Sequence, residues 1–299
     1  MSTHTVRGII CTILGAVCWG FSGACGQYLF TYKNIEPDWL TVVRMIIAGS
    51  ILIVFGMPKY GPQFLGILKN KTDRKQLIIF SIIGLMTCQY SYLTAVANSN
   101  AGTATVLQYL EPILVMIFIC FKLKKSPSTR EISAVILAVI GVFLIATHGN
   151  INTLAISGKG LIWGLLAALT ASACSIMPVR IIQKWGSTVV TGYGMLIGGL
   201  FLLIATRQWN TSVHFDIETI VGIAVITIIG TALAFTLFLR GLSDIGPVKG
   251  TIIGSIEPVS AAVFTFIWLN TPFTLIDGLA FICILSAVPI LTYGIKKKN

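Results

Sequence analysis

Charged side chains are scarce in this sequence. Only 10% of its 299 residues are Asp, Glu, Lys or Arg, whereas 55% are hydrophobic; ordinary soluble domains are about a quarter charged. Mean hydropathy is +0.89. Apolar runs of roughly 20 residues, the length that crosses a bilayer, recur along the chain and leave no segment large enough for a soluble domain. The composition therefore predicts an all-α membrane protein whose surroundings are the lipid bilayer.

The sequence also lacks the signatures of several functional classes. It has no Gly-rich phosphate loop ending in Gly-Lys-Ser or Gly-Lys-Thr, so ATP-driven transport is not expected. Its histidines, His4, His148 and His214, lie in loops or at span ends, and its seven cysteines show no paired spacing. The sequence therefore indicates no metal site, no cofactor and no intramembrane enzyme.

Apolar runs and loop signals predict ten transmembrane helices. The predicted spans cover residues 8–30, 38–57, 76–97, 100–121, 130–148, 160–182, 187–206, 217–239, 247–269 and 272–295. The first run is long, uninterrupted and without a cleavage pattern, so we interpret it as a retained helix and not as a signal peptide.

The net charge of +11 follows the pattern of a membrane topology. With the N-terminus inside, most basic residues fall in loops on one side, and Lys33, Lys159 and Arg207 fall on the other. Because basic residues are enriched in cytoplasmic loops, both termini are predicted to be cytoplasmic. This topology explains the charge without a nucleic-acid partner. The short loops favour a bacterial inner membrane.

A repeated Glu-Pro pair indicates an internal duplication. The two pairs, at 111–112 and 257–258, lie 146 residues apart, close to half the chain length. We therefore divide the chain into two five-helix repeats, residues 1–149 and 150–299. Because five is odd, the second repeat enters the membrane from the opposite face. Such inverted repeats are typical of secondary transporters that work by alternating access around a midplane site.

Several stretches carry a resemblance to a known family. They read "AVCWGFSGACGQ", "LTVVRMIIAGSIL", "YLTAVANSNAGTATVLQYLEP" and "RGLSDIGPVKGTIIGSIEPVSAAVF". On these motifs the chain resembles, over essentially its whole length, the EamA-type branch of the drug/metabolite transporter superfamily. The first Glu-Pro departs from many relatives, which place another residue before the proline.

The resemblance implies a monomeric or homodimeric carrier of small metabolites with a central cavity. It favours export of amino acids or related solutes. Two acids inside the membrane also suit import, or proton-coupled carriage, of a cationic amine or drug. A membrane receptor or scaffold is the alternative from a different class.

Charges well inside the predicted spans are the first candidates for a functional site, because such charges are expensive in a bilayer. They are Arg44, Glu111 and Glu257. The two acids lie near mid-depth and could bind a cationic group, exchange protons, or remain protonated. They could instead serve only the helix structure beside proline. Arg44 could pair with an acid or bind a substrate carboxylate, but snorkelling to the interface is its default interpretation.

Other polar and aromatic residues lie near these charges at helical spacing. The candidates for a small-solute cavity are Gln108, Thr105, Gln89, Tyr92 and Trp19. Close helix packing is predicted where glycine recurs every fourth residue, at Gly246, Gly250 and Gly254. Helix kinks are predicted at Pro112, Pro178 and Pro258.

Overall fold

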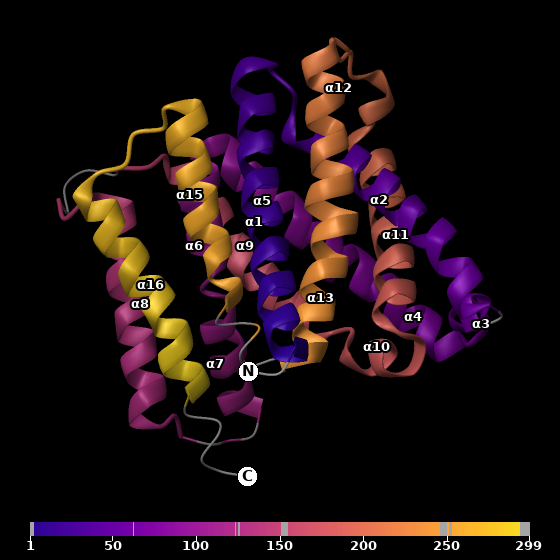
Figure 1. Ribbon diagram of the computed structural model, residues 1–299, viewed down its shortest axis with the longest axis horizontal. Helices are drawn as coiled ribbons and strands as arrows, with labels where there is room; N and C mark the ends of the chain where they lie inside the picture. The colour runs from indigo at the N-terminus through magenta and orange to yellow at the C-terminus, as the bar shows by residue number, and fades with distance from the viewer. Residues whose placement is uncertain are drawn as a thin grey trace.

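The fold is entirely helical in the part of the chain that the structure describes (Figure 1). This structure is a computed structural model, and it describes residues 3–61, 63–122, 124, 126–150, 155–245, 250 and 253–293. The predicted all-α class is therefore confirmed.

Fifteen α-helices of the described residues alternate with short turns and two π-helical segments. The first half contains α1 (Thr3–Tyr32), α2 (Pro37–Tyr60), α3 (Gln63–Lys69), α4 (Lys71–Ile79), the π segment η1 (Phe80–Met86), α5 (Thr87–Asn98), α6 (Ala101–Gln108), α7 (Glu111–Lys122) and α8 (Thr129–Thr147). The second half contains α9 (Gly158–Ile176), α10 (Val179–Trp185), α11 (Ser187–Thr206), the short 3-10 helix η2 (Gln208–Asn210), α12 (Ile217–Ala224), the π segment η3 (Val225–Leu233), α13 (Ala234–Ile245), α15 (Ile256–Leu269) and α16 (Leu275–Tyr293).

Seven helical stretches of the described residues are long and apolar enough to cross a membrane, and three shorter apolar helices accompany them. The three shorter ones are Ile217–Leu233, Ile256–Leu269 and Leu275–Ile290. All of these stretches overlap predicted spans, so the multi-pass character is clear. The count of ten crossings and their inverted arrangement remain predictions.

The faces at the two ends of the helices can be told apart by the chain path (Figure 1). We call the face where α1 begins and α16 ends the terminal face, and the face where α1 ends and α12 begins the far face. The sequence predicts that the terminal face is cytoplasmic.

Glycines allow α1 to lie very close to two partners, α13 and α15. A Cβ atom on Gly241 of α13 would lie 2.8 Å from both the Gly8 carbonyl oxygen and the Thr12 nitrogen of α1, and one on Gly20 of α1 would lie 2.7 Å from the Ala261 nitrogen of α15. Real side chains cannot occupy such short distances. Glycine is therefore required for the close contact between these backbones.

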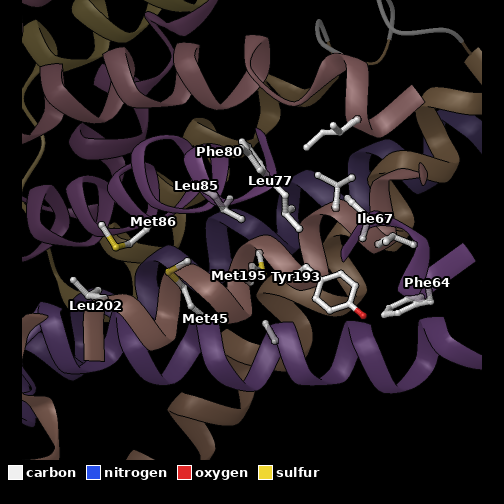
Figure 2. Packing of buried hydrophobic residues seen from close by; sticks show 14 of the residues in the cluster. Met45, Phe64, Ile67, Leu77, Phe80, Leu85, Met86, Tyr193, Met195 and Leu202 are labelled. Atoms are coloured by element: carbon white, nitrogen blue, oxygen red, sulfur yellow. The ribbon is translucent and has the colours of Figure 1, made fainter. Parts of the chain in front are cut away.

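A hydrophobic cluster holds α2 and α11 against the third predicted span (Figure 2). Met45, Leu77 and Met195 are fully buried there, and the rings of Phe64 and Tyr193 pack with centroids 5.2 Å apart. Lipid tails are as apolar as these side chains, so close van der Waals packing between the helices, and not transfer out of water, is what stabilises this cluster within a bilayer. This cluster anchors the helices that surround the central polar residues.

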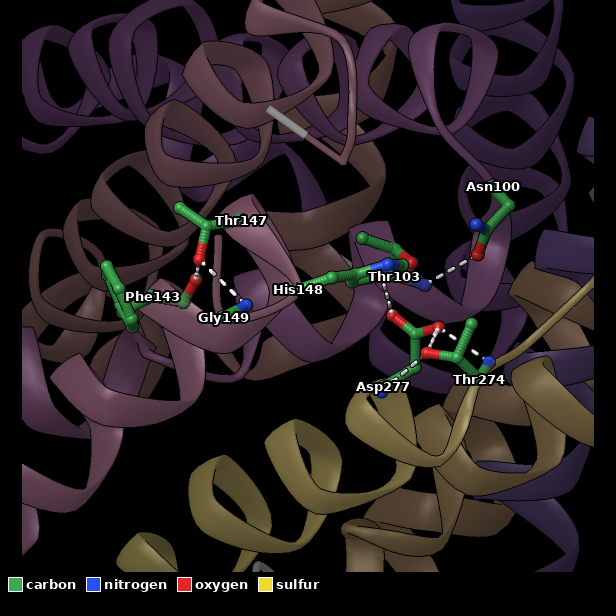
Figure 3. A network of polar contacts seen from close by, with 8 residues as sticks. All are labelled: Asn100, Thr103, Phe143, Thr147, His148, Gly149, Thr274 and Asp277. Carbon is green, nitrogen blue, oxygen red and sulfur yellow. Dashed lines mark hydrogen bonds and ion pairs between the residues drawn. The ribbon is translucent and has the colours of Figure 1, made fainter. Parts of the chain in front are cut away.

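Polar contacts fasten the helix ends at the far face (Figure 3). His148 Nε2 lies 2.8 Å from Asp277 Oδ1, and the other oxygen of Asp277 accepts hydrogen bonds from the Thr274 N–H and Oγ–H, each at 2.8 Å. The Asn100 side chain caps α6 by accepting from the Thr103 N–H at 2.8 Å. These contacts join the end of α8 to the start of α16 and fix where α6 begins.

Candidate functional site

Both Glu-Pro pairs stand at breaks in the helices. A turn at Tyr109 and Leu110 separates α6 from α7, which begins at Glu111. A turn at Ser255 comes directly before α15, whose second residue is Glu257. Proline is tolerated in the first turn of a helix, where its missing N–H has no intrahelical partner. The two prolines, Pro112 and Pro258, therefore begin new helices and do not bend continuous ones.

This position also suits the two carboxyl groups. Glu111 and Glu257 lie in the first turns of α7 and α15. The N-terminal end of a helix carries partial positive charge, which stabilises a negative group placed there. Broken helices whose N-terminal ends meet near mid-membrane are a recurring way to build transporter sites.

Glu111 is held by two serines of α9. The Ser175 hydroxyl donates to Glu111 Oε1. The Ser172 hydroxyl lies 3.2 Å from the Glu111 carbonyl oxygen, to which it donates. The Glu111 side chain is half-buried, so these contacts orient the carboxyl group and leave part of it exposed.

Arg44 is buried within electrostatic range of the second acid. Glu257 is within electrostatic range of both Arg44 and Glu111. The Arg44 side chain is only 6% exposed, and its Nε donates to Thr231 Oγ1 at 3.3 Å. Thr231 in turn donates to the Ile226 carbonyl five residues earlier, at 3.0 Å, which follows the π-helical spacing of η3. Arg44 therefore does not snorkel to an interface, contrary to its default interpretation.

Tyrosines and small polar groups complete the cluster. The Tyr92 hydroxyl lies 3.0 Å from Thr105 Oγ1, and Tyr92 is within electrostatic range of Arg44 and Glu257. Gln108 Nε2 donates to Cys88 Sγ at 3.6 Å. Tyr109 lies within electrostatic range of both acids. We call Arg44, Tyr92, Tyr109, Glu111 and Glu257 the central cluster.

Other predicted site residues lie farther from these contacts. Trp19 packs on Phe238 with ring centroids 4.8 Å apart. A Cβ on Gly254 would lie 3.1 Å from the Phe238 ring and 3.2 Å from the Tyr109 hydroxyl, so Phe238 connects Trp19 to the edge of the cluster. Gln89 is half-buried and, among the described residues, makes none of the hydrogen bonds that connect the cluster.

The remaining predicted packing and kink positions have mixed outcomes. Pro178 lies in the turn that separates α9 from α10, and the carbonyl of its neighbour Met177 accepts from Gln76 Nε2 at 2.9 Å. Gly250 is buried. Gly246 lies outside the described residues. Within the described part of the chain, no group of three His, Cys, Asp or Glu residues could hold a metal ion.

Comparison with known proteins gives the family. The sequence model of the EamA-like transporter family matches residues 6–147 and again residues 158–293. The chain belongs to the EamA-like transporter family. It is therefore a multi-pass membrane transporter by family, in agreement with its apolar helices.

Individual relatives of this EamA-like chain carry transporter names. The uncharacterized inner membrane transporter YicL of Salmonella typhimurium is 35% identical over 294 residues, which cover 98% of both chains. An uncharacterized transporter of Methanothermobacter thermautotrophicus is 19% identical and covers 97% of this chain and 87% of its own. One solved crystal structure has a TM-score of 0.63 at 17% identity and covers 99% of both chains, which shows a shared fold.

Sequence reasoning missed several groups around the cluster of this EamA-like chain. Ser172, Ser175 and Thr231 contact the charged residues, yet hydroxyl groups in apolar spans usually bond only to their own helix. The three-residue step between the two serines, ahead of Pro178, was the one available signal. Thr231 carried no such signal because the π segment shifts it out of the regular helical spacing.

Proposed function

We propose that this chain is a secondary transporter that carries small solutes across the membrane by alternating access around the central cluster. The observation that carries the proposal is that Glu257 lies within electrostatic range of both Glu111 and the buried guanidinium of Arg44, with each acid at the start of a half-helix. Opposite charges in an apolar span are expensive to retain unless they serve a solute or an ion.

Matching features in the two halves support an inverted repeat of residues 1–149 and 150–299. The Glu-Pro breaks lie 146 residues apart. The segments η1 and η3 begin 145 residues apart and end 147 apart. Asn70 and Asp216, also 146 apart, cap the first helix of the third and eighth predicted spans through their side-chain oxygens. The family model also matches the two halves separately.

Helix packing supports two groups that could move against each other. In the first group, α1 packs on α13, η3 and α15. In the second, α9 packs on α5, α6 and α7. The same pairing of the first predicted span of one half with the third and fourth spans of the other occurs twice. We call these sets the first and second bundles.

Contacts near the far face join the two bundles. Gln27 of α1 donates through Nε2 to Thr271 Oγ1 at 2.9 Å, and its Oε1 accepts from the Ala101 N–H of α6 at 2.8 Å. Beside it, a Cβ on Gly102 would lie 3.0 Å from Ala262 Cα of α15. Alternating access from this face requires these contacts to separate.

The charges favour a zwitterionic solute such as an amino acid, with export as the direction. In this assignment Arg44 binds the solute carboxylate, and Glu257 or Glu111 binds its ammonium group. A cationic amine, with or without proton coupling, is the second candidate because the acids outnumber the single buried arginine. An amino acid would need Arg44 for its carboxylate, whereas a cationic amine would not.

Binding to purified protein tests the proposal. We expect Glu257→Gln to weaken a bound amino acid about 10- to 100-fold, because a charged hydrogen bond contributes about 1.5–3 kcal/mol. We expect Glu111→Gln to weaken binding of the amino acid as well. Arg44→Met should weaken an amino acid but not an amine. The readout is a ligand-induced rise in melting temperature across amino acids and amines.

The matched control is Glu36→Gln, because Glu36 is exposed and its side chain makes no capping hydrogen bond. If all three variants of the central charges bind and transport like the parent, the charges serve helix structure alone and the proposal fails.

A further inference from the structure

A groove between α7 and α8 lies apart from the central cluster. Its volume is about 540 Å³, within the size range of small-molecule sites. Its lining residues are Met116, Ile117, Cys120, Phe121, Lys124, Ser126, Pro127, Glu131, Ile132, Val135 and Ile136. None of the central charges lines this groove, so it is a site separate from the central cluster.

The groove exists because α8 is held mainly by another helix. Extensive packing joins α8 to α16, whereas only a few residues of α7 and α8 approach each other. The two helices are joined at the terminal face and separate from there. Apolar side chains beside the opening point outward: Phe121 is 80% exposed and Ile136 is 55% exposed. Such side chains face lipid in a membrane-spanning protein.

The two ends of the groove differ in chemistry. Met116, Ile117 and Val135 form an apolar part deeper along the helices. Exposed Lys124 and Ser126 stand at the terminal face, within a loop that the sequence makes basic through Lys122, Lys124, Lys125 and Arg130. The acid at this end, Glu131, already accepts a hydrogen bond from the Ser128 N–H as part of the cap of α8. The polar end therefore has an excess of positive charge.

We propose that this groove binds an anionic phospholipid, with an acyl chain between α7 and α8 and the phosphate beside Lys124. An apolar slot that ends in a basic loop at the membrane surface matches both parts of such a lipid. A zwitterionic lipid offers the same acyl chains without the net negative charge. In this proposal Lys124 selects the lipid headgroup, and the apolar wall of the groove binds the acyl chain.

Cys120 supplies a reporter inside the groove. The experiment uses the full chain with the other six cysteines replaced by serine or alanine, purified in mild detergent. The rate of Cys120 labelling by a maleimide is measured after addition of dioleoyl phosphatidylglycerol or dioleoyl phosphatidylcholine. We expect phosphatidylglycerol to slow labelling several-fold more than phosphatidylcholine. Lys124→Gln should remove the difference between the two lipids, and Lys71→Gln, an exposed lysine outside the groove, should preserve it.

Two controls keep the result specific. Ile136→Trp should fill the groove and protect Cys120 without added lipid. A variant that retains only Cys283, on α16, should label at the same rate with either lipid. Lipid extracted from the purified parent should contain more phosphatidylglycerol than lipid from Lys124→Gln.

Two outcomes would overturn the proposal. Equal protection by both lipids would mean that the groove takes up bulk lipid without selecting the headgroup. Protection that rises with protein concentration, together with Cys120–Cys120 cross-linking, would mean that a second copy of the chain occupies the groove.

Discussion

Gln27 offers the sharpest test of movement at the far face, because one side chain joins the two bundles. Gln27→Leu keeps the size of the side chain but removes both of its hydrogen bonds, at 2.9 Å to Thr271 and 2.8 Å from Ala101. Each bond contributes about 0.5–1.5 kcal/mol net. Only the bond to Ala101 of α6 crosses between the bundles, because Thr271 directly follows α15 of the first bundle. Losing it should shift the balance toward the form open at the far face by about 1 kcal/mol, or about 5-fold in population.

Cys88 can report that opening, because it is buried and accepts a hydrogen bond from Gln108 beside the central cluster. In a variant that retains only Cys88, a membrane-impermeant thiol reagent added at the far face should label it faster when Gln27 is leucine. Asn98→Leu is the matched control, since among the described residues its side chain bonds to the Thr94 carbonyl of its own helix and to no other group. Equal labelling rates in Gln27→Leu and the parent would refute the assignment of Gln27 as a far-face closure.

Two further substitutions test packing and surface charge. Gly20→Ala should lower the melting temperature markedly, since its Cβ would lie 2.7 Å from the Ala261 nitrogen and 2.8 Å from the Glu257 carbonyl oxygen. Gly26→Ala is the control and should have a mild effect, because the nearest atom to its Cβ would be Leu93 Cδ2 at 3.7 Å. Equal shifts in melting temperature would contradict the close contact of α1 and α15. Lys33 hydrogen-bonds Asp216 and, with the Thr219 N–H, lowers the pKa of that carboxyl, so its stabilisation should be present above about pH 4 and be lost as pH falls toward the lowered pKa. The small melting-temperature deficit of Lys33→Met at pH 7 should therefore shrink progressively as pH falls below about 4, unlike any deficit of Lys159→Met. A deficit that does not change with pH would contradict the ion pair.

The sequence was most informative where a costly residue stood in an apolar setting. Glu111, Glu257 and Arg44 were identifiable because ionisable groups are rare inside spans, and the equal spacing of the Glu-Pro pairs pointed to a duplication. Helix extents followed from apolar length: the predicted span 187–206 coincides with α11 (Ser187–Thr206). Such features depend on local composition, which a single sequence contains.

Contacts between distant segments could not be predicted from the sequence. The partners of Gln27 lie 74 and 244 residues away, and nothing in their composition marks them. The role of Arg44 was misjudged for a related reason. Its depth in a span was visible, but Thr231, which accepts its hydrogen bond, and Glu257, which lies within electrostatic range, come from the other half of the chain.

The π segments have a consequence for how related sequences should be compared. Each residue of a regular helix turns the chain by about 100°, so a residue absorbed into a wider turn rotates everything after it by that angle. Side chains before and after η3 (Val225–Leu233) therefore follow different rotational phases along one span. An alignment that assumes an unbroken helical period will place Thr231 on the wrong side of the helix, and a relative that lacks one residue here will present a different side chain to Arg44.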